Sequence, residues 1–302
     1  MKIGLIAQLH GAPNLARPAP TWESVSRFAT TAEGIGFDSF VFEDALLYRG
    51  EVTQGSWESV SIAAALAATT SRIKIGQSVV NAPYRSPALI AKTAETLDEI
   101  SGGRYLFGLG AGNTDDSDYA AFGFATDRRY SRFAEAIEII HGLLKDGSVN
   151  FDGEFYFAKE AELVLRGPRP QGPPIIIAAA GPRMLRLVAR YADEWNWWTS
   201  DAGDTEQLRP VIEELELACA ECDRDPASLE RSLDVYTVDP LGQAAAKHPG
   251  SEGLVTGSPA EIAEVLLGFD ALGFAEVRCD VYPKTLEGIE AMAEVVDRVH
   301  HG

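Results

Sequence analysis

The sequence contains few of the residues from which metal centres and disulfide frameworks are built. Only 3 cysteines and 5 histidines occur among its 302 residues. Cys219 and Cys222 have CxxC spacing, but they lie within a predicted helix, and no second pair completes the set of about four ligands that zinc needs. We therefore interpret the cysteines as structural or free thiols and predict no metal site.

Basic residues and long apolar runs are also scarce. The 26 Lys and Arg are outnumbered by 45 Asp and Glu, and the net charge of −19 disfavours nucleic acid and anionic membranes, since both require a basic surface. No apolar run approaches the roughly 20 residues of a membrane span, and residues 1–5 enter a predicted strand without a signal-peptide pattern. We expect a cytoplasmic protein that binds neither nucleic acid nor a membrane.

The chain does contain a regular alternation of short apolar segments and helical patterns. The predicted strands are residues 2–8, 37–42, 72–80, 104–109, 175–180, 193–197, 233–238 and 274–282, and a helical pattern follows each of them. Eight such units without a linker predict one domain over residues 1–302, an α/β fold of the single (β/α)8 TIM barrel type. A doubly wound sheet is the alternative. Residues 148–172 interrupt the alternation with a hairpin signal, which predicts a short insertion.

Residues 173–198 contain the clearest turn from a strand into a helix. The apolar run 175–180 is followed by Gly181 and Pro182, which suit the N-cap and the first position of a helix. The free backbone amides and the positive dipole end of such a helix form a site for a phosphate. The alternative is a tight turn that requires glycine and binds nothing.

In a TIM barrel the functional residues lie at the carboxyl ends of the strands. Only one lysine, Lys284, is near a strand end, where a Schiff-base aldolase would need it, and the histidines do not cluster as in a metal hydrolase. A glycosidase with two catalytic carboxylates at the strand ends remains an alternative. The remaining strand ends are apolar, aromatic and glycine-rich, which suits a flat aromatic cofactor that carries its own reactivity.

Three segments together resemble the luciferase-like monooxygenase superfamily of flavin- and F420-dependent oxidoreductases. They are RIKIGQSVVNAPYRSPALIAK at 72–92, LDEISGGRYLFGLGAG at 97–112, and GPRML at 181–185 followed by ADEWN at 192–196. The resemblance extends from residue 2 to the last predicted helix. It implies a TIM barrel with an insertion near residues 148–172, and either the deazaflavin coenzyme F420 or FMN bound at the strand ends.

The resemblance also implies where the cofactor is held. Its phosphate belongs at the turn after the fifth strand, and the Gly-Pro-Arg-Met-Leu form of that turn resembles the F420-using branch. A cis peptide bond is implied at Ser78-Val79, as a bulge behind the flavin ring. The residues implied to bind the cofactor are Ser78, Val79, Val80, Asn81, Gly110, Gly112, Tyr130, Ala179, Ala180, Gly181, Pro182 and Arg183.

The chain departs from the family's F420-dependent sugar-phosphate dehydrogenases at two strand ends. Those enzymes have Asp-His after strand two and Gly-x-Gly-Glu after strand four, where this chain has Asp44-Ala45 and a Gly-x-Gly followed by Asn113. The candidate catalytic residues are His10, Asp44 and Asn113. His10 suits acid–base work because histidine exchanges protons near neutral pH, although a lone histidine is often structural. Asn113 suits either a hydrogen bond to the ring edge or a turn.

Aromatic residues near strand ends suggest a substrate pocket. Tyr84, Trp195 and Trp197 are expected to line it, although alternate residues of a strand point to opposite faces. The implied reaction on a small organic substrate is hydride transfer with F420 or monooxygenation with FMN. A separate flavin or F420 reductase and a second copy in a homodimer are the expected partners. A non-catalytic flavin-binding relative is the alternative function.

Overall fold

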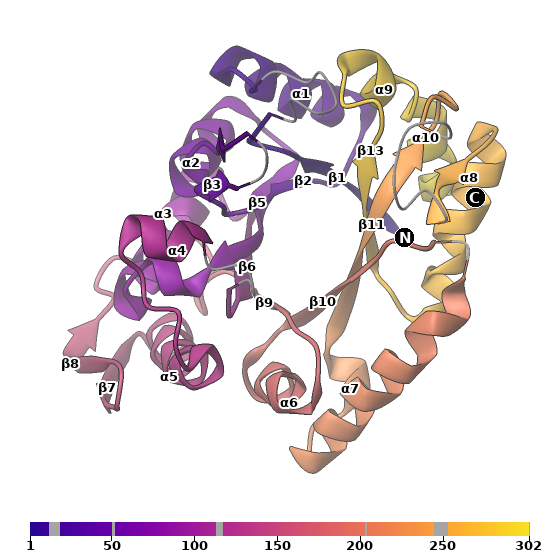
Figure 1. Cartoon of the computed structure of the whole chain (residues 1–302). Helices are drawn as coiled ribbons and strands as arrows, with labels where there is room; N and C mark the ends of the chain where they lie inside the picture. Colours follow the sequence, from indigo (N-terminus) through magenta and orange to yellow (C-terminus); the bar gives the residue numbers. More distant parts are fainter. Residues whose placement is uncertain (12–18, 50–51, 113–116, 203, 245–252, 302) are drawn as a thin grey trace.

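The computed structural model describes residues 1–11, 19–49, 52–112, 117–202, 204–244 and 253–301. Eight parallel strands close into a barrel in the order β10-β9-β6-β5-β2-β1-β13-β11, and β10 also pairs with β11 (Figure 1). These strands are β1 (Lys2–Ala7), β2 (Ser39–Phe42), β5 (Lys74–Asn81), β6 (Tyr105–Gly110), β9 (Ile175–Ala178), β10 (Glu194–Thr199), β11 (Glu230–Asp239) and β13 (Glu276–Val281). The closure confirms the predicted TIM barrel, because a doubly wound sheet has open edges.

Helices cover the outside of the barrel (Figure 1). They are α1 (Trp22–Ile35), α2 (Ser59–Thr69), α3 (Pro87–Ser101), α5 (Arg129–His141), α6 (Pro182–Tyr191), α7 (Arg209–Glu221), α8 (Pro259–Gly268), α9 (Leu286–Glu290) and α10 (Ala293–His301). Two of them begin at capping boxes, in which Thr21 pairs with Ser24 and Ser258 with Glu261. None of the helices in the described ranges has the length and apolar character needed to cross a membrane.

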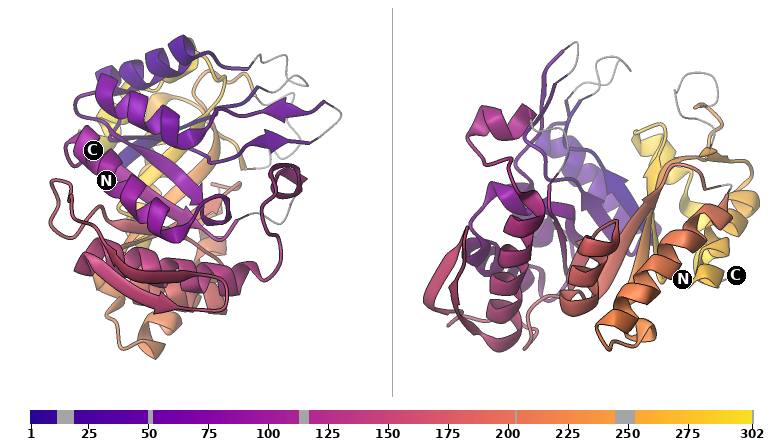
Figure 2. Two further views of the ribbon diagram at one scale, coloured as in Figure 1. Left: turned by 90° about the vertical axis from the view of Figure 1, so that its left-hand side faces the viewer. Right: turned by 60° about the horizontal axis from the view of Figure 1, so that its bottom comes forward.

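Several short elements were not expected from the sequence. The strands β3 (Leu47–Tyr48) and β4 (Gln54–Gly55) form a hairpin, α4 (Ser117–Phe122) follows β6, and β12 (Val255–Thr256) pairs with the end of β11. Two-residue strands carry too little periodicity to be predicted. In Figure 2 the β3–β4 hairpin and α4 project beyond the same end of the barrel. The predicted eighth helix is also divided, into α9 and α10.

The predicted insertion is an antiparallel hairpin of β7 (Ser148–Asp152) and β8 (Phe157–Glu162). The Glu135 carboxylate of α5 accepts hydrogen bonds from the backbone N–H groups of residues 154–156 in its turn, at 2.8 to 3.0 Å. These bonds hold the hairpin against α5. The insertion therefore adds to the outside of the barrel and leaves the strand order unchanged.

A charged cluster fills the interior of the barrel. Arg278 is fully buried there, with Nη2 2.8 Å from Glu194 Oε1, Nε 3.4 Å from Glu276 Oε1 and Nη1 3.8 Å from Asp234 Oδ1. We call these four residues the Arg278 cluster. Gly4 makes room for it, because a Cβ at that position would lie 3.0 Å from Arg278 Cγ. Burial raises the pKa values of Glu194 and Asp234, although Arg278 opposes the rise.

We predict that Arg278→Met lowers the free energy of unfolding by about 3–5 kcal/mol at neutral pH, because three buried carboxylates lose their counter-charge. Acids whose pKa is raised in the folded state stabilise it at low pH and lose that contribution as the pH rises. The deficit should therefore be smaller near pH 5 than near pH 8, as measured by urea unfolding at both pH values. Arg298→Met, at an exposed pair with Glu294, is the control and should cost less than about 1 kcal/mol.

Candidate active site

The end of β5 carries a bulge at the mouth of the barrel. Its pairing with β6 skips from Gln77 to Val80, and the Ser78-Val79 peptide bond between them is cis, as the family resemblance implied. The Ser78 hydroxyl donates a hydrogen bond to Asp234 Oδ2 at 2.8 Å, which joins the bulge to the Arg278 cluster. The Val80 side chain is buried in the core, so that this residue offers only backbone atoms to a ligand.

Glycines at the end of β6 leave space for the bulge. A Cβ at Gly110 would lie 2.7 Å from Val79 Cγ2, closer than real side chains approach. At Gly112, where φ is 92°, a Cβ would lie 3.2 Å from Asn81 Oδ1. The Gly-x-Gly sequence therefore allows two strand ends to pack closely below the mouth.

Of the two asparagines predicted near the flavin ring, Asn81 and Asn113, the structure describes only the first. Asn81 is buried, its amide Nδ2 donates to the Tyr119 hydroxyl at 2.7 Å, and its backbone N–H donates to Asp44 Oδ2 at 2.9 Å. These partners favour the turn-forming role over a contact with a ligand. Asn113 lies outside the described residues.

The structure surrounds Asp44, a predicted catalytic residue, with hydrogen-bond donors. Its buried carboxylate accepts hydrogen bonds from Arg85 at 2.5 and 3.1 Å and from the Ser59 hydroxyl at 2.7 Å, besides the Asn81 amide. Ser59 begins α2 and Arg85 precedes α3, so the carboxylate is held on the helix side of the sheet. The adjacent Glu43 contacts His10 instead, and the catalytic role of Asp44 stays a prediction.

Glu43 forms an ion pair with His10. The distance from His10 Nε2 to Glu43 Oε1 is 3.0 Å, and His10 Nδ1 lies 2.6 Å from the Gly11 carbonyl oxygen. The Tyr48 ring packs on the imidazole with 4.3 Å between ring centroids. Both ring nitrogens of His10 thus face an oxygen atom, and these two contacts orient the ring. Burial raises the pKa of Glu43, but hydrogen bonds from His10 and Tyr48 outweigh it and lower that pKa overall.

A cavity of about 840 Å³ opens beside His10, at the ends of β1 and β13. Gln8 Nε2 lies 3.5 Å from Asp280 Oδ2 in its wall, and Lys284 forms an ion pair with the same carboxylate. Gln54 Oε1 is buried at this cavity and has no hydrogen-bond partner among the described residues. An unsatisfied buried acceptor is uncommon and points to a missing donor.

The turn from β9 into α6 has the form predicted for a phosphate site. Gly181 is the N-cap, with φ of 76°, and a Cβ built on it would meet no atom within 4 Å. Ala180 and Arg183 are exposed, and the Arg183 guanidinium lies 3.8 Å from the centroid of the Tyr130 ring. The structure therefore brings Tyr130, at the start of α5, to the predicted turn. The surroundings of Gly181 at this turn are therefore open.

The structure places the predicted pocket residues Trp195 and Trp197 on the outer face of β10. Glu194 and Asn196 point into the barrel, where Asn196 Nδ2 lies 3.0 Å from Asp234 Oδ1, so the alternate residues Trp195 and Trp197 face the helices. Trp195 is fully buried, and its indole N–H donates to the Ala179 carbonyl at 3.0 Å. Trp197 packs against the same outer core.

Tyr84 is likewise not in an open pocket. It is buried, its hydroxyl donates a short hydrogen bond to Asp118, and its ring lies 5.1 Å from that of Tyr119. Instead, Trp198 and Tyr236 are the exposed aromatic pair on the inward-facing positions of β10 and β11, with their ring centroids 5.9 Å apart.

Sequence reasoning did not single out Glu43, Tyr48 or Asp280 as site residues. Glu43 and Asp280 could have been found from the alternation of side chains along β2 and β13. Counting in steps of two from the residues that point into the barrel reaches both of them. Tyr48 belongs to the β3–β4 hairpin, whose two-residue strands are too short to show a periodic pattern.

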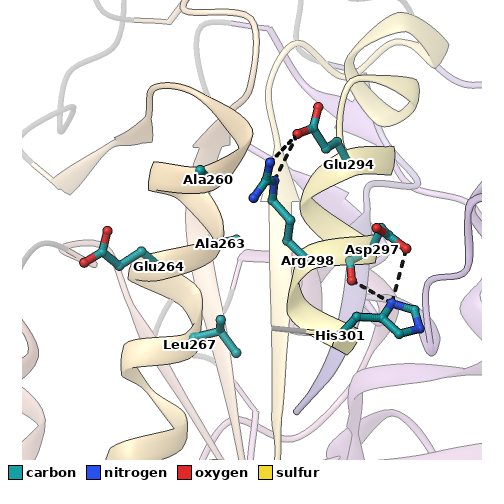
Figure 3. Close-up of a pocket in the computed structure, with 8 residues that line it drawn as sticks. All are labelled: Ala260, Ala263, Glu264, Leu267, Glu294, Asp297, Arg298 and His301. Carbon is teal, nitrogen blue, oxygen red and sulfur yellow. Dashed lines mark hydrogen bonds and ion pairs between the residues drawn. The ribbon is translucent and has the colours of Figure 1, made fainter.

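A second hollow lies away from the mouth, between α8 and α10 (Figure 3). Arg298 pairs with Glu294 at 2.7 Å and His301 with Asp297 at 3.2 Å, each within α10. These charges neutralise one another on an exposed flank, and we do not consider this hollow a candidate site.

The fold and the mouth define a TIM-barrel protein whose strand ends are shaped to hold a ligand. The chain belongs to the luciferase-like monooxygenase family, because the model of that family matches residues 1–246. Family membership agrees with the resemblance found in the three sequence segments.

Two curated relatives and one solved structure illustrate the similarity. The chain is 41% identical over 128 residues to 5,10-methylenetetrahydromethanopterin reductase of Archaeoglobus fulgidus. The matched segment covers 42% of this chain and 37% of that protein. It is 31% identical over 197 residues to F420-dependent glucose-6-phosphate dehydrogenase of Amycolatopsis mediterranei. That match covers 62% of this chain and 57% of the relative. The chain thus matches less than two thirds of the length of either relative. An F420-dependent secondary alcohol dehydrogenase, solved with an F420-acetone adduct, has the same fold, with a TM-score of 0.82 at 20% identity over 99% of this chain and 98% of that chain.

We predict that Gly110→Ala lowers the free energy of unfolding by about 1–3 kcal/mol, because the added methyl group displaces Val79 from the bulge. Urea unfolding measures the effect. Gly34→Ala, within α1, is the matched control, since no atom lies within 4 Å of the added methyl group there. That variant should be neutral or more stable by up to about 1 kcal/mol. Equal effects of the two substitutions would contradict the close packing of β6 on the bulge.

Proposed function

We propose that the chain is an oxidoreductase that binds coenzyme F420 or FMN at the barrel mouth and acts on a small organic substrate. The observation that carries the proposal is the position of three features on one side of the mouth: the bulge of β5, the glycines of β6 and the open N-terminus of α6 after β9. These strands are neighbours in the barrel. Together they suit a flat ring system joined to a phosphate.

The residues present fit such a cofactor. Backbone amides at the start of α6 and the Arg183 guanidinium would hold the phosphate, and the Val79 bulge would support the ring. When bound, F420 supplies hydride transfer and FMN supplies oxygen activation. The Amycolatopsis relative and the secondary alcohol dehydrogenase are both F420-dependent, which favours F420 for this chain.

We expect the purified protein to bind F420 with micromolar or tighter affinity in a fluorescence titration, and FMN more weakly. Arg183→Ala should weaken F420 binding about tenfold, since a charge-assisted hydrogen bond to the phosphate is lost. Arg190→Ala, in the last turn of the same helix, removes an equal charge and should leave the affinity unchanged. Binding of neither cofactor would refute the proposal.

The residues opposite the phosphate turn are suited to handle the proton of the reaction. Reduction of a carbonyl group requires a hydride at its carbon and a proton at its oxygen, and the reverse reaction removes both. His10 lies after the end of β1, beside the cavity, and contacts Glu43. We infer that His10 exchanges this proton with the substrate, and that Glu43 is a positioning residue that orients the ring.

We predict that Glu43→Gln lowers kcat about tenfold and leaves cofactor affinity unchanged, because the carboxylate that orients the His10 ring is replaced by a weaker acceptor. Turnover assays and a cofactor titration of the variant measure the two effects. Asp297→Asn, at the exposed pair with His301 on α10, is the control and should leave both unchanged. Unchanged turnover of Glu43→Gln would argue against the positioning role. His10→Asn should reduce turnover by about 100-fold or more while cofactor binding persists.

The second candidate function is a flavin-binding protein without catalytic activity. It is favoured by Ala45, which stands where F420-dependent sugar-phosphate dehydrogenases of this family have histidine. Turnover of any substrate with reduced or oxidised cofactor would rule it out. We also expect a homodimer, which analytical ultracentrifugation would test, and an FMN-using chain would need a separate reductase.

A further inference from the structure

The cavity beside His10 extends from the mouth to the outside of the barrel wall. In β1, Ile6 belongs to the apolar cluster inside the barrel, whereas Leu5 belongs to the core between the strands and the helices. The cavity touches both residues, and therefore passes around the carboxyl end of β1. Its far end lies where α1 and α9 cover β1 and β13 (Figure 1). β1 is four strands away from β9, so the cavity opens across the mouth from the phosphate turn.

The end of the cavity at the mouth is polar, and the charged side chains there contact one another. Lys284 is paired with Asp280, and His10 Nε2 lies 3.0 Å from Glu43 Oε1. A carboxylate, phosphate or ammonium group of a ligand would have to break one of these pairs or remain uncompensated. An uncharged polar group avoids this cost. A hydroxyl group would also supply the donor that Gln54 Oε1 lacks among these residues.

The far end of the cavity is mainly apolar. Val25 and Phe28 of α1, Ile289 of α9 and Leu5 of β1 line it. The hydroxyl groups of Thr21, Ser24 and Thr285 also belong to the lining, but they are hydrogen-bonded within the caps of α1 and α9. All charged side chains among the described lining residues belong to the mouth end. Water in this apolar part makes few hydrogen bonds, and an apolar ligand group that replaces it gains hydrophobic free energy in proportion to the area buried.

We propose that this cavity is the substrate pocket and that the substrate is an uncharged amphipathic molecule. Its hydroxyl or carbonyl group lies at the mouth beside His10, and its apolar chain or ring lies between β1, α1 and α9. The volume of about 840 Å³ is in the range of small-molecule sites. The inference rests on the proposed oxidoreductase function for the identity of the reacting group, but the shape and polarity of the pocket are independent of it.

The test is a binding series of straight-chain 2-alkanones and 2-alkanols, from butanone and butanol to decanone and decanol. Isothermal titration calorimetry on the protein without cofactor gives the affinity of each compound. We expect the affinity to rise about threefold for each added methylene group until the apolar end is filled. Alkanoates and alkylamines of equal length should bind at least about tenfold more weakly, because their charge has no partner.

The length limit is the chain length beyond which a further methylene group no longer raises the affinity. Two substitutions of Phe28 should move this limit in opposite directions. Phe28→Trp shortens the apolar end and should end the gain in affinity at a shorter chain, whereas Phe28→Ala should extend it to a longer one. Leu217→Trp, which adds a similar apolar area at an exposed position of α7, is the matched control and should change nothing. Circular dichroism verifies that each variant is folded.

The outcomes separate this inference from the proposed function. An affinity independent of chain length, equal binding of alkanoates and alkanones, or a length limit that does not respond to Phe28 would overturn the substrate class. Length-dependent binding together with a failed F420 and FMN titration would leave the pocket in place and refute the oxidoreductase. Cofactor binding without length-dependent binding of alkanones would support the oxidoreductase and refute the substrate pocket.

Discussion

The barrel depends on the pairing of one buried arginine with three buried carboxylates. Arg278 has ion-pair partners on β10, β11 and its own strand β13, so a single guanidinium joins adjacent strands at the point where the barrel closes. Burying such a cluster costs desolvation free energy, and removing any one of its charges leaves another buried charge without a partner. Gly4 beside the cluster has no room for a side chain, because a Cβ there would clash with Ser39 Oγ and lie 3.0 Å from Arg278 Cγ.

The same cluster connects to the mouth. Asp234 contacts Arg278 on one side and accepts the Ser78 hydroxyl hydrogen bond on the other, so the position of the β5 bulge is coupled to the centre of the barrel. On the outer side of the bulge, Asp44 holds the Asn81 backbone and Arg85. The bulge is thus fixed from both faces of the sheet. Rigid support of this kind is what a bound ring system requires, since orientation is the main contribution of the protein.

The mouth is divided into two sides with different chemistry. The side formed by β5, β6 and β9 has glycines, an open helix N-terminus and Arg183, and we assign it to the cofactor. The side formed by β1 and β13 has two acid–cation pairs and the cavity, and we assign it to proton exchange and to the substrate.

The sequence by itself determined the eight strand and helix units, the insertion and the turn at Gly181, because hydrophobic periodicity and glycine or proline punctuation are local properties. It also placed the bulge at Ser78-Val79, through the family resemblance. Only the tertiary structure decided which side chains face the mouth. Asp44 and Glu43 are neighbours in the chain, but the phase of β2 turns one toward α2 and the other toward His10. Trp195 is buried because the phase of β10 turns it toward the helices, and Tyr84 because its hydroxyl meets Asp118, 34 residues later in the chain.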